Sequence, residues 1–231
     1  VVANTLSQVA QSEGMERKGL ILTLLLKLKQ ICNHPAQYLH QIEEDSETNI
    51  QLIGRSGKLN RLVVLLENII SSGERALIFT QYAEMGKMLS RFLPHALGRP
   101  VQFLYGGTSV KQRDQMVRRF QEDENCPPVF ILSLKAGGLG LNLTRASQVI
   151  HYDRWWNPAV EDQATDRTYR IGQLQNVQVR KFITIGTLEE RIDEMIEAKK
   201  GLADAIIDSN EAWLTELSTE ELRDLVQLRQ P

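Results

Sequence analysis

Between residues 75 and 185 the chain alternates short apolar runs with stretches of helical periodicity, and this alternation restricts the fold more than any other feature. Strands that are separated by helices are typical of an α/β fold with an open, mostly parallel sheet and helices on both faces. Ligands of such sheets bind at the carboxyl ends of the strands, so we expect functional residues in the loops that follow them. The predicted strands cover residues 75–80, 101–105, 129–134, 148–152 and 177–185.

The segments on either side of this alternation differ from it. Residues 1–19 lack strong periodicity and predict an incoming connector, whereas residues 18–32 have the apolar spacing of a helix. Thr187 and Glu190 have the spacing of a capping box and predict an acidic helical tail. The predicted organisation is a helical run-in and connector over residues 1–55, an α/β lobe over residues 56–186 and a helical brace or tail over residues 187–231.

The composition is that of an ordinary globular protein, with 42% hydrophobic and 24% charged residues. No apolar run is long enough to suggest a membrane span, and no signal peptide is visible. Two distant cysteines, Cys32 and Cys126, indicate a reducing compartment. The net charge is −2, but residues 187–231 alone carry 12 acidic and 5 basic residues, which leaves +5 on the preceding body. This distribution permits a nucleic-acid surface without establishing one.

A glycine-rich loop follows the predicted strand at residues 129–134. Three glycines over residues 137–140 would let the backbone approach a ligand closely, and Ser133 and Lys135 beside them favour a phosphate contact. The spacing is not that of a dinucleotide-binding fingerprint, because the third glycine of that motif is missing. A tight turn from a strand into a helix remains the alternative.

Two further strand ends carry candidate nucleic-acid contacts. Thr108 follows two glycines, and Arg113 lies in the next predicted helix, which fits either a phosphate seat or an N-cap with a solvated arginine. Trp155 and Trp156 stand beside Arg154 in the loop after residue 152. They fit either the core or the stacking surface of a nucleic-acid groove. Both interpretations stay open for each loop.

The stretch over residues 161–173 places two arginines on one side of a predicted helix. Gln163, Arg167 and Arg170 are spaced i, i+4, i+7 and lie beside an apolar stripe. A planar guanidinium group that is held in such a place suits a phosphate group. Salt bridges to neighbouring aspartates on a solvated helix are the alternative interpretation.

The chain lacks the motifs that would let it hydrolyse a nucleotide alone. Gly57-Lys58 is not part of a phosphate-binding loop, because Leu59 replaces the required hydroxyl residue. No adjacent Asp-Glu pair lies on a predicted strand, where it could hold Mg²⁺. Cys32 and His34 have no second ligand pair at usable spacing, so we expect a structural turn there and no metal site.

The order and spacing of these segments resemble the second RecA-like lobe of Swi/Snf-type ATPases, the double-stranded-DNA translocases of helicase superfamily two. The resemblance is close over residues 31–185. The matching sequence motifs are LKQICNHP at 28–35, SGK at 56–58, IFTQY at 78–82, GGT at 106–108, SLKAGGLGLN at 133–142, DRWWNP at 153–158 and QATDRTYRIGQ at 163–173. The last of these motifs is highly specific.

This resemblance implies roles for individual residues. Arg167 and Arg170 match the arginine fingers that reach the γ-phosphate of ATP held by the first lobe. Gly138, Gly140 and Gln163 would lie along the same cleft. The residues that would face the DNA backbone are Thr108, Arg113, Ser133, Lys135 and Trp156.

The resemblance also implies an ATP-dependent DNA translocase whose ATP and Mg²⁺ are bound mainly by a first lobe outside this chain. The fragment alone is then expected to be inactive, with the first lobe, duplex DNA and a protein–DNA complex as partners and no membrane. Thr165 and Tyr169 are closer to the residues of prokaryotic family members at these positions. The resemblance therefore implies a location in the cytoplasm or nucleoid for a prokaryotic protein, and in the nucleus for a eukaryotic one. The alternatives are a nucleic-acid- or protein-binding module without a motor, and a lobe of an RNA helicase.

Overall fold

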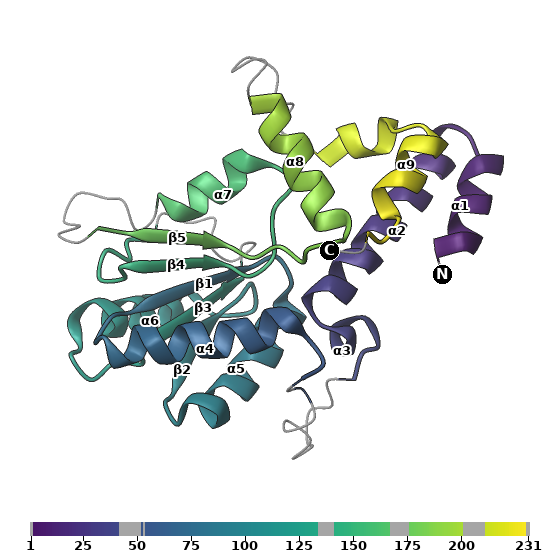
Figure 1. Cartoon of the computed structure of the whole chain (residues 1–231). Helices are drawn as coiled ribbons and strands as arrows, with labels where there is room; N and C mark the ends of the chain where they lie inside the picture. Colours follow the sequence, from purple (N-terminus) through teal and green to yellow (C-terminus); the bar gives the residue numbers. More distant parts are fainter. Residues whose placement is uncertain are drawn as a thin grey trace.

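The computed structural model describes residues 2–41, 52, 54–133, 141–166, 176–200 and 211–229. Within these ranges, five parallel strands form one sheet in the order β2-β3-β1-β4-β5 (Figure 1). The prediction of an α/β fold with a mostly parallel sheet is therefore confirmed. The strands are β1 (Ala76–Thr80), β2 (Val101–Leu104), β3 (Val129–Ser133), β4 (Gln148–His151) and β5 (Gln178–Lys181).

Side chains of the central strand β1 alternate between the two faces of the sheet. Ala76 and Ile78 belong to one apolar core, and Leu77 and Phe79 belong to the other. All five residues of β1 are buried, because a parallel sheet carries helices on both faces. The helices on the first face are α4 (Gly57–Ser71) and α5 (Ala83–Leu97), and those on the second face are α6 (Val110–Glu122) and α7 (Pro158–Thr165).

Local capping signals set the ends of these helices. The Ser56 hydroxyl accepts the Leu59 N–H at 3.3 Å and caps α4. Ser109 and Gln112 form a capping box at the start of α6. Gly98 ends α5 with a φ of 60°, a conformation that glycine adopts without strain. These caps fix where the helices meet the loops of the sheet.

The helices before and after the α/β domain pack on each other and form what we call the helical cluster, seen beside the sheet in Figure 1. None of the helices in the described residues is long and apolar enough to cross a membrane. The two ends of the chain thus contribute to one unit, while the boundaries at residues 55 and 186 stay a prediction. The cluster comprises α1 (Val2–Gln11), α2 (Gly14–Asn33), α8 (Leu188–Lys200), η2 (Glu211–Glu216) and α9 (Thr219–Val226), and the short α3 (Pro35–Tyr38) follows α2.

The expectation that residues 1–19 lack strong periodicity is wrong, while their role as an incoming connector stays a prediction. Residues 2–11 form α1, and α2 already begins at Gly14. Val2, Leu6 and Val9 have helical spacing and pack into the core of the helical cluster. Their partners include helices from the far end of the chain, such as α9, so the local pattern alone was too weak to predict them.

Candidate functional site

The carboxyl ends of the parallel strands meet at the edge of the sheet that faces the helical cluster (Figure 1). Thr80 at the end of β1 pairs in register with Ser133 at the end of β3. The loop after β4 starts at the same edge and carries Asp153, Arg154 and both neighbouring tryptophans. Among the predicted site residues that the structure describes, Ser133 ends β3, Thr108 lies in the turn after β2 and Trp156 lies in the loop after β4.

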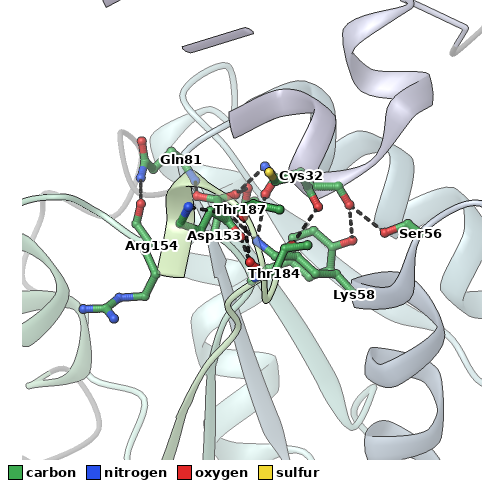
Figure 2. A network of polar contacts seen from close by, with 12 residues as sticks. Cys32, Ser56, Lys58, Gln81, Asp153, Arg154, Thr184 and Thr187 are labelled. Carbon is green, nitrogen blue, oxygen red and sulfur yellow. Dashed lines mark hydrogen bonds and ion pairs between the residues drawn. The ribbon is translucent and has the colours of Figure 1, made fainter. Parts of the chain in front are cut away.

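Asp153 is the centre of a buried polar network at this edge (Figure 2). Its carboxylate accepts the Thr80 hydroxyl at 2.5 Å, the Gln81 N–H at 2.8 Å and the Asn33 side-chain amide at 3.2 Å. Complete burial raises the pKa of Asp153, although the charge of Lys29 and the hydrogen bonds from Thr80 and Gln81 oppose the rise. Asp153 therefore joins the ends of two strands to the end of α2.

Lys58 forms the second half of this network (Figure 2). Its ammonium group lies 2.7 Å from the Glu189 carboxylate, and the two side chains are only 4% and 0% exposed. The other oxygen of Glu189 accepts the Thr184 N–H at 2.9 Å. Lys58 is thus bound in an ion pair between α4 and α8, which agrees with the conclusion that Gly57-Lys58 is not a phosphate-binding loop.

The Cys32–His34 segment has structural contacts at the same junction. The His34 ring accepts the Ala36 N–H at 3.0 Å and, through its other nitrogen, donates to the Leu52 carbonyl at 3.2 Å. Burial raises the pKa of Cys32 to about 11, and the nearby Glu189 charge adds to the rise. The thiol therefore stays protonated at neutral pH. Within the described ranges, no group of three His, Cys, Asp or Glu residues could hold a metal ion.

Helix α7 carries the start of the stretch over residues 161–173. Gln163 is exposed on it, while Ala164 is 1% exposed and packs against the sheet. The helix ends at Thr165. Arg167 and Arg170 lie outside the described residues, so the predicted face that they share with Gln163 stays a prediction.

Two of the predicted DNA contacts are partly exposed at the end of β2. The Thr108 hydroxyl accepts the Tyr105 N–H at 3.1 Å and so closes a turn, while Ser109 and not Thr108 caps the next helix. Arg113 lies in the first turns of α6 and is half-buried. Thr108 also lines a pocket of about 520 Å³ with Tyr105 and Arg119. This part of the surface is open to a ligand.

Two other predicted contacts are buried. Ser133 and Trp156 are each 2% exposed. The Trp156 ring belongs to the core of the helical cluster, with the Lys29 ammonium group 4.2 Å from its centroid. Both side chains are thus nearly inaccessible among the described residues, and the helical cluster covers the tryptophan. Gly138, Gly140 and Lys135 lie outside the described residues.

Four residues that the sequence did not single out for a role are buried at this edge: Asn33, Asp153, His151 and Glu161. The sequence does contain a signal that they are buried, because they are polar residues next to otherwise apolar runs. A buried polar group needs a hydrogen-bond partner, so each of them was a candidate for a polar contact. Their partners come from distant segments, so the pairing itself could not be predicted from local pattern.

His151 predicts a pH dependence of stability. Its ring is fully buried and donates to the Thr165 hydroxyl at 3.0 Å, and burial lowers its pKa to about 4. An unfolded histidine titrates near 6.5, so the unfolded chain binds the extra proton between these values and stability is lost as the pH falls through this window. We expect a loss on the order of 3 kcal/mol between pH 7 and 4 from this residue.

Urea denaturation at several pH values, for the wild type and His151→Gln, measures this contribution. Glutamine keeps a donor towards Thr165 but does not titrate, so the free energy of unfolding should change less steeply with pH in the variant. Equal slopes for the two proteins would contradict the assignment.

Known proteins are similar to this chain over nearly its whole length. A family model described as the helicase conserved C-terminal domain matches residues 57–172. The putative ATP-dependent helicase/translocase YwqA of Bacillus subtilis is 55% identical over 228 residues, which cover 99% of this chain and 24% of that protein. The mouse SWI/SNF-related matrix-associated actin-dependent regulator of chromatin subfamily A member 1 is 36% identical over 95% of this chain and 21% of its own length. The chain thus spans about a quarter of these relatives.

Solved structures show the same extent of similarity. The C-terminal domain of the SWI2/SNF2 ATPase of Sulfolobus solfataricus has a TM-score of 0.80 and 41% identity, covering 99% of this chain and 90% of that chain. The SWI2/SNF2 ATPase core of the same organism in complex with double-stranded DNA has a TM-score of 0.84 and 44% identity, covering 99% of this chain and 46% of that chain. The similarity includes both the α/β domain and the helical cluster.

Proposed function

Because this chain belongs to the Swi2/Snf2 family, as the RecA-like helicase C-terminal lobe of its ATPase core, we propose that it is the second motor lobe of an ATP-dependent translocase on double-stranded DNA. The observation that carries the proposal is the position of α7, which follows the carboxyl edge of the sheet and leads directly into Arg167 and Arg170. Arginines that reach a bound nucleotide can stabilise the charge that develops on a transferred phosphoryl group, as arginine fingers do.

The nucleotide and Mg²⁺ are proposed to be held mainly by the first lobe of the full-length protein. The sequence of this chain has no Walker loop, and Lys58 is already paired with Glu189. Gly138, Gly140 and Gln163 are proposed to line the nucleotide cleft from this side. The bound ATP supplies the phosphoryl group, and the residues of this chain contribute positive charge and shape to the cleft.

The proposed DNA contacts divide into two groups. Thr108 and Arg113 are partly exposed, and together with Lys135 they are proposed to bind phosphates of the DNA backbone. The burial of Ser133 and Trp156 favours a different role, in which they support the loops that carry such contacts. The enzyme is proposed to act on a protein–DNA complex in the nucleoid of a prokaryotic cell.

The test joins this chain to its upstream lobe and measures ATP hydrolysis without nucleic acid, with duplex DNA and with RNA. We expect hydrolysis only in the joined protein, stimulation by duplex DNA, and a duplex affinity that falls steeply with salt because phosphate contacts release counterions. A joined protein that binds DNA without hydrolysing ATP would favour a module without a motor. Stronger stimulation by RNA would favour an RNA helicase.

A further inference from the structure

Helix α7 is short and packs against the sheet. Its eight residues are capped by Asn157, whose side-chain oxygen accepts the Ala159 N–H at 3.0 Å. Among its described side chains, Ala164 supplies the contact with the apolar core. An alanine buries little surface, so polar contacts help to fix the orientation of this helix.

Glu161 supplies these contacts from the first turn of α7. Its side chain is 0% exposed, and one carboxylate oxygen accepts Arg154 Nε at 2.7 Å and the Trp155 N–H at 2.9 Å. The other oxygen lies 2.8 Å from the Lys181 ammonium group on β5. Burial disfavours the charge, but Arg154 and Lys181 outweigh it, so the pKa of Glu161 is lowered. The carboxylate therefore holds α7 to the loop after β4 and to the edge strand.

Arg154 extends this contact to the helical cluster. Its side chain is 5% exposed, and the guanidinium group binds Asp193 of α8 as well as Glu161. Trp156, two residues after Arg154, lies in the core of the helical cluster. The loop that leads into α7 is therefore anchored to that cluster as well. The orientation of α7 thus depends on α8 and not only on the sheet.

We propose that Arg154 and Glu161 are positioning residues for Arg167 and Arg170, which follow α7 in the sequence. Asp193 of α8 takes part in this positioning through its ion pair with Arg154. The proposal rests on the proposed function, because it requires that Arg167 and Arg170 act at the nucleotide and that these contacts align them. Helix α7 ends at Thr165, and Arg167 and Arg170 follow in the sequence, so the orientation of α7 sets the direction in which this segment begins. Small displacements of catalytic groups cost large factors in rate.

Asp193 allows a test that leaves α7 anchored. Its side chain is 27% exposed, so Asp193→Asn weakens the contact of α8 with Arg154 but leaves Arg154, Glu161 and Lys181 in place. In the full-length protein with saturating duplex DNA, we expect kcat for ATP to fall about tenfold or more, while KM changes less than about twofold. Thermal unfolding and duplex affinity should stay at wild-type values.

Two matched variants separate positioning from a general effect of charge. Glu194→Gln makes the same change at an exposed neighbour on α8 and should keep wild-type kcat. Asp193→Glu restores a carboxylate and should recover most of the lost kcat. Equal kcat for Asp193→Asn and Glu194→Gln, or a loss that only follows the unfolded fraction, would overturn the proposal. A wild-type protein without DNA-stimulated hydrolysis would instead overturn the proposed function.

Discussion

Arg170→Ala in the full-length protein is expected to lower the kcat of DNA-stimulated ATP hydrolysis by about 10³ to 10⁵ while duplex DNA binding stays nearly intact. The reason is that an arginine finger contacts the phosphoryl group and not the nucleic acid. Its five donors stabilise charge that develops only in the transition state, so its loss appears in kcat more than in KM. Steady-state ATPase assays and duplex titration of the same preparations measure both quantities.

Arg99→Ala is the matched control, because Arg99 is an exposed arginine before β2, at the opposite edge of the sheet. We expect wild-type turnover from it. Arg170→Lys keeps the charge but not the fork of donors, so it should recover only part of the activity. Wild-type-like turnover by Arg170→Ala would refute the assignment of the arginine pair to the nucleotide.

The sheet could be predicted from the sequence because its signal is local. Every residue of β1 and β3 is buried, and a strand that is covered on both faces has a nearly continuous apolar sequence, which here ends in Thr80 and Ser133. The resemblance to Swi/Snf-type ATPases is confirmed for the same reason, since it rests on contiguous strings that follow these strands. Helix α1 was missed because its partners lie at the other end of the chain.

The buried polar contacts at the carboxyl edge could not be predicted, because the two residues of each contact are distant in sequence. Lys58 and Glu189 are 131 positions apart, and Asn33 and Asp153 are 120 apart. The tryptophan loop left two interpretations open for a similar reason. Only the position of the helical cluster decides that Trp156 is buried, and a local pattern cannot report which element covers a side chain.

The Lys58–Glu189 ion pair should contribute strongly to stability as long as both partners are present. Lys58→Met leaves the Glu189 carboxylate buried at 0% exposure without its counter-charge, and breaking a buried pair in this way typically costs about 3 to 5 kcal/mol. We expect a loss of this size in the free energy of unfolding from urea denaturation of the chain. The pair joins α4 to α8, so the effect should include loosening of the helical cluster from the α/β domain.

Two further variants test whether the buried charge causes this loss. Lys58→Met with Glu189→Gln removes the uncompensated charge but keeps an acceptor for the Thr184 N–H, so the double variant should be more stable than Lys58→Met alone. Lys18→Met breaks an exposed pair with Glu216 and should change stability far less, because water screens that pair. If both single lysine variants lost the same free energy, burial would not decide the strength of the Lys58–Glu189 pair, and the hydrogen bonds of Asp153 would hold this edge instead.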